Sequence, residues 1–260
     1  MKYRKKQIVL LCLPGLLLLG LLLLKPGYYL YRELTYRMGT PTAAEETVYS
    51  YAQEQKIPYG QYPTELIGLL DRNPETRNFV LNYPFREEIQ PDISGYGRET
   101  VPLFLQWDPM WGYEEYGSGP LAITGCGPTC LAMVGYYFTG DTNMTPGQIA
   151  AFAEENGYYA PGYGSSWTLI SEGAEELGFT ATELPLVKKK MVTALEEGKP
   201  VIVALGEGDF TTEGHYIVLT GVEADGFRVN DPNSQERSGR LWTYEQLEPQ
   251  IRNIWAISME

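Results

Sequence analysis

Acid–base chemistry near neutral pH would depend on one side chain in this protein, because the sequence contains a single histidine, His215. Only imidazole titrates in that range without help from its surroundings. His215 lies at the start of an apolar, strand-like run, Gly-His-Tyr-Ile-Val-Leu-Thr-Gly at 214–221. It is therefore the first candidate for proton transfer.

A candidate nucleophile is Cys126, in the segment Gly-Cys-Gly-Pro-Thr-Cys at 125–130. Cysteine attacks as a thiolate, which the N-terminus of a helix and a neighbouring imidazolium both stabilise. Pro128 suits the first turn of a helix, and Gly125 and Gly127 are expected to leave the backbone open to a substrate. Cys130 lies one turn further along the same helix, where we expect it to be packed and inert.

A third candidate is Asp231, just after the predicted strand 227–230. Period-two alternation puts Asp231 on the same face as Phe227 and Val229, so its carboxylate points inward and needs a partner. One candidate partner is His215, whereas the structural alternative is a turn aspartate in Asp-Pro-Asn-Ser. Asn230 competes for the role of orienting the histidine, but it lies on the opposite strand face, which favours Asp231.

The pattern of elements predicts an α+β arrangement, in which helices come first and an antiparallel sheet follows. Apolar runs, caps and Gly or Pro boundaries predict the individual elements. The predicted helices span 126–138, 146–156, 167–177 and 187–197, and the predicted strands span 101–106, 179–184, 201–205, 215–221, 227–230 and 253–259.

Four segments in order resemble the bacteriocin-processing, double-glycine-type cysteine peptidases of the papain-like clan, and more closely their stand-alone relatives without a transporter. These segments are Gln-Trp-Asp-Pro-Met-Trp-Gly at 106–112, the 125–130 segment, Phe-Thr-Thr-Glu-Gly-His-Tyr-Ile-Val-Leu-Thr-Gly at 210–221, and Val-Asn-Asp-Pro-Asn-Ser at 229–234. The resemblance covers Val101 to Ser258. It implies a papain-like peptidase fold, with a lobe that carries the catalytic helix packed on an antiparallel sheet.

The resemblance also implies roles for four residues and a peptide or protein substrate. Cys126 would be the nucleophile, His215 the general base and acid, Asp231 the group that orients the imidazole, and Gln106 a donor to the oxyanion. Together they would hydrolyse peptide bonds through an acyl-enzyme. The same triad could instead cleave peptidoglycan stem peptides or transfer amide groups. A catalytically inactive surface-binding module is the alternative from another class.

The N-terminal sequence predicts a membrane anchor. Residues 1–6 are rich in Lys and Arg, and Ile8 to Leu24 is a leucine-dominated run without a charge, long enough to span a bilayer core. We expect a cytoplasmic tail and retained signal anchor at 1–25, a stalk and helical extension at 26–98, and a peptidase domain at 99–260 outside the cytoplasmic membrane. A cleaved signal peptide is the alternative.

Composition narrows the range of partners and cofactors. The formal net charge of −13 would repel phosphate backbones, which argues against nucleic acid as a partner. Three cysteines, one of them inside the apolar N-terminal run, cannot form a disulfide framework, so free thiols are expected. One histidine and two domain cysteines are too few ligands for a zinc site, and neither a metal nor a cofactor is expected.

Overall fold

The computed structural model describes residues 25–87, 89–162 and 164–259. The expected membrane anchor at Ile8–Leu24 lies outside these residues. Within the described ranges, no helix is both long and apolar enough to cross a bilayer. The chain divides into two compact units, Met1–Phe85 and Arg86–Glu260.

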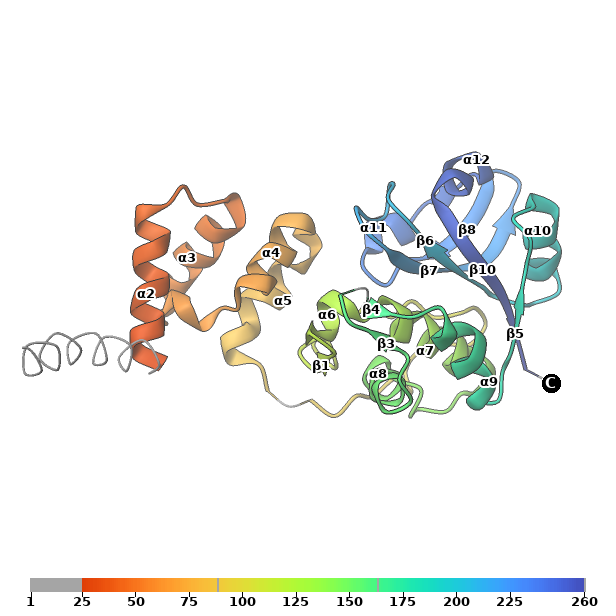
Figure 1. Cartoon of the computed structure of the whole chain (residues 1–260), viewed down its shortest axis with the longest axis horizontal. Coiled ribbons are helices and arrows are strands. Elements are labelled where there is room, and N and C mark those ends of the chain that lie inside the picture. Colours follow the sequence, from red (N-terminus) through yellow and green to blue (C-terminus); the bar gives the residue numbers. More distant parts are fainter. Residues whose placement is uncertain (1–24, 88, 163, 260) are drawn as a thin grey trace, which may run out of the picture. The chain divides into compact units, whose positions relative to one another are not determined.

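The described part of the first unit is helical (Figure 1). It contains α2 (Lys25–Met38), α3 (Ala43–Gln55), α4 (Thr64–Arg72) and α5 (Arg77–Asn82), with three 3₁₀ turns, η1 (Tyr59–Gln61), η2 (Pro74–Thr76) and η3 (Tyr83–Phe85). Helix α3 begins with a reciprocal capping box between Thr42 and Glu45, as the Thr-Ala-Ala-Glu pattern indicates. Apolar residues of α3, α4 and α5, such as Val48, Leu66 and Val80, are fully buried.

The second unit is built around a six-stranded antiparallel sheet. Its strand order is β5 (Thr180–Glu183), β10 (Ile251–Ser258), β6 (Val201–Leu205), β7 (His215–Glu223), β8 (Gly226–Asn230) and β9 (Leu241–Trp242). The β6–β7 register pairs Leu205 with His215, so His215 lies at the end of a central strand. The predicted α+β class is confirmed.

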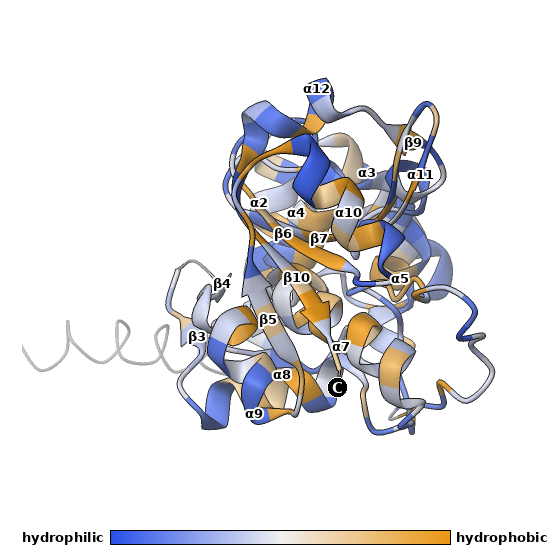
Figure 2. Ribbon diagram, turned by 90° about the vertical axis from the view of Figure 1, so that its right-hand side faces the viewer, coloured by the Kyte–Doolittle hydropathy of each residue, from blue (hydrophilic) through white to orange (hydrophobic). Residues whose placement is uncertain are grey.

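Helices cover both faces of this sheet (Figure 1). On one face, α7 (Cys126–Thr139) and α8 (Pro146–Glu155) pack against alternate strand residues that include Tyr216 and Val218. On the other face, α10 (Lys188–Glu196) and α12 (Tyr244–Leu247) pack against the intervening residues, Ile217 and Leu219 among them. Strands β6 and β7 are therefore hydrophobic along most of their length rather than alternating (Figure 2).

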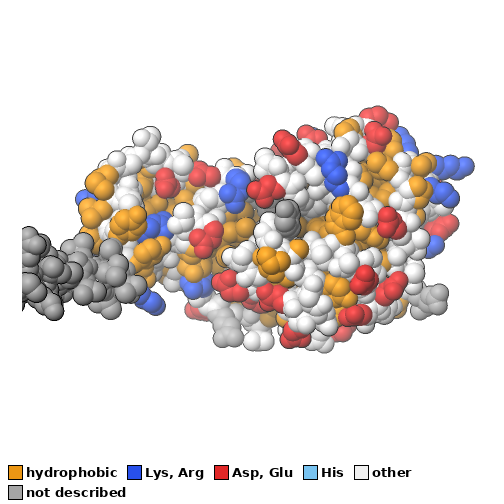
Figure 3. Space-filling view, viewed as in Figure 1, with side chains coloured by type: hydrophobic (Ala, Val, Ile, Leu, Met, Phe, Trp, Pro, Cys, Tyr) orange, Lys and Arg blue, Asp and Glu red, His pale blue; other side chains and the backbone are white. Residues whose placement is uncertain are grey.

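Short elements complete the unit around the ends of the helices. They are β1 (Glu115–Tyr116), β2 (Gly119–Pro120), α6 (Leu121–Thr124), the hairpin β3 (Tyr159–Ala160) and β4 (Gly164–Ser165), α11 (Gln235–Ser238) and the 3₁₀ turn η5 (Glu248–Gln250). Acidic side chains are spread over the visible face of this unit (Figure 3), in keeping with the net charge of −13.

One predicted element is wrong. The segment 101–106 is not a strand, because the backbone carbonyls of Val101 and Pro102 accept hydrogen bonds from the Asn230 side chain instead of pairing with the sheet.

The predicted helix 167–177 is present, but it is not a regular α-helix throughout. Its middle is a five-residue π-helical segment, η4 (Leu169–Gly173), that continues into the short helix α9 (Ala174–Glu176).

The Asn230 contact generates the first testable prediction. Asn230→Ala removes the amide group that donates to the Val101 and Pro102 carbonyls at 2.9 and 3.0 Å. We expect the free energy of unfolding of the second unit to fall by about 1–3 kcal/mol. All five tryptophans lie at or after Trp107, so tryptophan fluorescence during urea titration follows this unit alone.

The control is Asn143→Ala, because Asn143 makes an exposed side-chain bond to Asp141. Its free energy of unfolding should change by less than about 0.5 kcal/mol. Equal destabilisation by the two variants would contradict the role assigned to Asn230.

Candidate active site

Cys126 is the first residue of α7, a 14-residue helix that is closed by Gly140 in a left-handed conformation. Its thiol is partly accessible, whereas the helix beyond it is buried from Gly127 to Tyr136. The side chain thus lies at the positive end of the helix dipole. The helix and its start are those that the sequence predicts.

His215 and Asp231 form a buried pair. The imidazole Nε2 and the carboxylate Oδ1 are 2.7 Å apart, and the two residues are only 8% and 0% exposed. An ionised carboxylate can only accept, so Nε2–H donates to Asp231 and Nδ1 is the nitrogen left for Cys126. The Cys126 side chain also contributes to raising the pKa of His215, so the thiol lies close to the imidazole. Thiol, imidazole and carboxylate therefore lie next to one another in series.

The charges of this series favour an imidazolium and a carboxylate. Burial lowers the pKa of His215, but the Asp231 charge and hydrogen bonds to Asp231 and Cys126 outweigh it and raise this pKa to about 10. Burial alone would raise the pKa of Asp231, yet the charges of His215 and Arg237 hold it below its usual range. The arrangement can accept a thiol proton and keep it on the imidazole, as nucleophilic acyl transfer requires.

Arg237 is the site residue that sequence reasoning missed. Its Nε donates to Asp231 Oδ2 at 2.5 Å, on the carboxylate oxygen opposite to the one that faces His215. Arg237 belongs to the four-residue helix α11, which starts with a Ser234 cap. A helix this short shows no hydrophobic periodicity in the sequence, although Ser234 is a residue type that favours the N-cap position. In the turn that follows Asp231, the Asn233 backbone N–H is a third donor to the Asp231 carboxylate.

The other two predicted residues, Asn230 and Gln106, lie apart from the imidazole contact. Asn230 donates to Val101 and Pro102, and Asp231 is the residue that contacts His215. Gln106 is 3% exposed, and its Nε2 donates to the Ala122 carbonyl at 2.8 Å, which uses one of two amide hydrogens. Its backbone N–H donates to the Pro232 carbonyl at 2.7 Å, so the Gln106 segment is tied to the turn that follows Asp231.

The two glycines beside Cys126 have a different role from the one expected. A Cβ atom on Gly127 would lie 2.6 Å from the Ser165 hydroxyl, and one on Gly125 would lie 2.5 Å from the Leu121 side chain. The space beside them is therefore filled by protein rather than open to a substrate. Gly127 permits close packing of the β3–β4 hairpin against the start of α7, where Ser165 also bonds with the Tyr116 hydroxyl at 2.8 Å.

Cys130 differs from Cys126 in every respect that governs thiol reactivity. It is fully buried, and burial raises the pKa of its thiol well above the usual range, with the nearby charges of Cys126 and Asp231 acting in the same direction. Both described cysteines are free, as predicted. Across residues 25–87, 89–162 and 164–259, no cluster of three His, Cys, Asp or Glu side chains could bind a metal.

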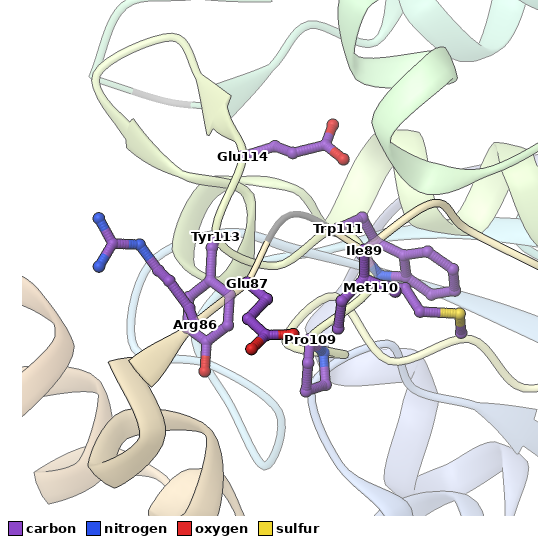
Figure 4. A pocket seen from close by; sticks show the side chains of 8 residues that line it. All are labelled: Arg86, Glu87, Ile89, Pro109, Met110, Trp111, Tyr113 and Glu114. Atoms are coloured by element: carbon purple, nitrogen blue, oxygen red, sulfur yellow. The ribbon is translucent and has the colours of Figure 1, made fainter. Parts of the chain in front are cut away.

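Three residues of the Gln-Trp-Asp-Pro-Met-Trp-Gly segment, Pro109, Met110 and Trp111, line a cavity other than the Cys126 site. This cavity has a volume of about 390 Å³ (Figure 4). Its walls are Arg86, Glu87, Ile89, Pro109, Met110, Trp111, Tyr113 and Glu114, none of which belongs to the Cys126–His215–Asp231 series. Trp111 anchors the loop by donating to the Leu105 carbonyl at 2.8 Å.

Two solved structures are similar to this chain. The peptidase domain of Streptococcus ComA, a bi-functional ABC transporter involved in a quorum sensing pathway, is 20% identical over 53% of this chain and 93% of that domain, with a TM-score of 0.41. A putative C39-like peptidase from Bacillus anthracis is 16% identical over 65% of this chain and 97% of that one, with a TM-score of 0.38. None of the curated protein sequences matches significantly.

The family comparison gives the decisive result. The model of the Peptidase_C39-like family matches residues 98–259, which is more than half of the chain and includes Cys126, His215 and Asp231. The chain therefore belongs to the Peptidase_C39-like family of cysteine peptidases.

Proposed function

We propose that the protein is a membrane-anchored cysteine peptidase that hydrolyses peptide bonds outside the cytoplasmic membrane with a Cys126–His215–Asp231 triad. The observation that carries this proposal is the buried pair of Asp231 and His215, 2.7 Å apart, with the partly accessible Cys126 thiol close to the same imidazole. Family membership supports a peptide substrate. The only histidine of the chain lies beside the one partly exposed thiol among the described residues.

The first half of the reaction forms an acyl-enzyme. In the starting state His215 Nδ1 already carries the thiol proton, and the Cys126 thiolate attacks the carbonyl carbon of the scissile bond. The oxyanion that develops is stabilised by the Cys126 backbone N–H and by the second amide hydrogen of Gln106. The imidazolium then gives its proton to the leaving amine as the C–N bond breaks, which leaves a thioester on Cys126.

The second half regenerates the enzyme. His215, now neutral, takes a proton from a water molecule as the water oxygen attacks the thioester carbon. The C–S bond then breaks and releases the carboxylic acid and the Cys126 thiolate, which restores the starting state. Asp231 keeps the ring in the orientation that directs Nδ1 toward Cys126 throughout the cycle. Arg237 holds the Asp231 carboxylate in place through the second oxygen, Oδ2.

Cys126→Ala provides the direct test of the nucleophile. We expect hydrolysis of a peptide library by the full-length chain to fall by at least about a thousandfold, because no acyl-enzyme can form. An iodoacetamide probe near neutral pH should label Cys126 and not the fully buried Cys130. Applied to intact cells, a membrane-impermeant maleimide should also reach Cys126 if the peptidase unit lies outside the membrane.

The matched control is Cys130→Ala, which should keep both hydrolysis and labelling at Cys126. Labelling at Cys130 that is unaffected by His215→Ala would contradict the assignment of the nucleophile. Retained hydrolysis in Cys126→Ala would exclude the triad altogether, and exclusion of the impermeant reagent would contradict the extracytoplasmic location.

The pKa of His215 can be measured directly, because isotope-labelled histidine gives NMR signals from a single ring. We expect an imidazolium up to an inflection near pH 10. In Asp231→Asn the negative charge that favours the cation is lost while burial still favours the neutral ring, so the inflection should move down by about 1–3 pH units. An unchanged inflection would show that Asp231 does not govern the charge of His215.

Arg237→Gln separates orientation of Asp231 from its charge. Loss of the Arg237 contact frees the carboxylate to rotate, and we expect kcat to fall by about 10- to 100-fold with a smaller change in KM. Asp231 remains ionised, so the His215 inflection should not fall as it does in Asp231→Asn. Arg240→Gln is the control, because Arg240 lies over the Trp242 ring and should affect neither value.

A further inference from the structure

Arg32, in the helical unit, is a buried cation bonded only to neutral oxygens. It is 8% exposed, and its Nη1 donates to the Thr64 hydroxyl at 2.8 Å, the Tyr28 hydroxyl at 3.2 Å and the Tyr62 carbonyl at 3.3 Å. No carboxylate among the described residues forms an ion pair with it. Buried charges are ordinarily compensated by an opposite charge, so the missing counter-charge calls for an explanation.

The guanidinium also has an unused edge. All of its hydrogen bonds of regular geometry to described residues come from Nη1, and its interaction with the Tyr59 hydroxyl is a less regular contact. Nε and Nη2 thus make no regular hydrogen bond to a described residue. These two atoms form the edge that binds a carboxylate or a phosphate through two parallel bonds. Arg32 is also one of the walls of a cavity of about 160 Å³.

A second unsatisfied donor lines the same cavity. Tyr59 is 1% exposed, and its hydroxyl has no hydrogen-bond partner of regular geometry. Burial raises the pKa of this phenol, so it keeps its proton at neutral pH. The Arg32 guanidinium carbon lies 5.3 Å from the Tyr59 ring centroid, which brings the two donors together. A neutral buried hydroxyl without an acceptor is uncommon in folded proteins.

We propose that this cavity binds a small oxyanion of the phosphate class. The Arg32 Nε–Nη2 edge would supply two charge-assisted hydrogen bonds and the Tyr59 hydroxyl a third. The anion would compensate the buried charge and give the unsatisfied phenol an acceptor. The ligand is a free phosphate or the phosphodiester of a lipid headgroup, since both present the same oxygens to these donors.

Glu45 sets the strength of this site. It is also part of the cavity wall, and its Oε2 accepts the Thr42 backbone N–H at 2.9 Å within the capping box of α3. Its carboxylate is thus engaged by the helix start instead of by Arg32. Its negative charge repels an anion in the cavity, which gives a variant expected to strengthen binding.

Calorimetric titration of the full-length chain in a non-ionic detergent tests the site, with sodium phosphate, dimethyl phosphate as the headgroup mimic, and sodium chloride at matched ionic strength. We expect saturable binding of phosphate or dimethyl phosphate that weakens with added salt. Binding of dimethyl phosphate identifies a headgroup as a ligand, and binding of inorganic phosphate alone identifies the free ion. Absence of saturable binding for both anions would overturn the proposal.

Variants assign the binding to the cavity. Tyr59→Phe should weaken affinity about tenfold without lowering the melting temperature, because the lost hydroxyl makes no hydrogen bond of regular geometry in the unliganded protein. Arg32→Lys keeps the charge but loses the two-nitrogen edge and should also weaken binding at least tenfold.

Two further variants complete the set. Glu45→Gln should strengthen binding several-fold, because it removes a like charge from the wall. Tyr62→Phe is the control, since its hydroxyl donates to the Leu81 carbonyl away from the cavity, and should bind as the wild type does. Wild-type affinity in Tyr59→Phe, or equal weakening in Tyr62→Phe, would refute the site.

Discussion

The hydrogen bond between His215 and Asp231 is the interaction on which the proposed site depends. A fully buried carboxylate is costly unless it is paired and hydrogen-bonded on all sides. Asp231 meets this condition through His215 and the Asn233 N–H on one oxygen and Arg237 on the other. Because donors from β7 and from the segment after Asp231 engage both oxygens, the carboxylate has little freedom to rotate, and the imidazole orientation follows from it.

The sheet supplies the distances that this interaction requires. His215 is the first residue of β7, and Asp231 directly follows β8. Strands β7 and β8 are hydrogen-bonded neighbours in the sheet. Helices pack against both faces of these strands, so their register is specified by burial on each side. Helix α7 is one of these covering helices, and its first residue is Cys126. The packing that stabilises the core therefore also positions the Cys126 thiol close to His215.

Position along α7 separates the chemistry of two identical side chains. Cys126 has the accessible first position, next to the imidazole and at the positive end of the helix. Cys130 is one turn later, where the protein surrounds it completely and keeps its proton bound. Close packing around Gly125 and Gly127 holds the start of the helix against Leu121 and Ser165. These glycines allow close packing that positions the start of α7, whereas the sequence suggested that they leave the backbone open to a substrate.

Much of this organisation follows from local sequence. The residues Cys126, His215 and Asp231, the helix that begins at Cys126, and the strands that carry or precede the other two are all predicted by motif order, caps and alternation. These signals are local, and strand alternation even favoured Asp231 over Asn230 before any contact was known.

Only the tertiary structure revealed the partners that come from distant or weakly patterned segments. Arg237 lies on a helix too short for periodicity, and Asn230 satisfies carbonyls more than a hundred positions earlier in the chain. The extended segment 101–106 has strand-like residues, yet side-chain bonds replace sheet pairing there. In the helical unit, the missing counter-charge of Arg32 depends on which groups surround it after folding. Local pattern thus determines which elements form, whereas burial and long-range hydrogen bonding decide which side chains meet.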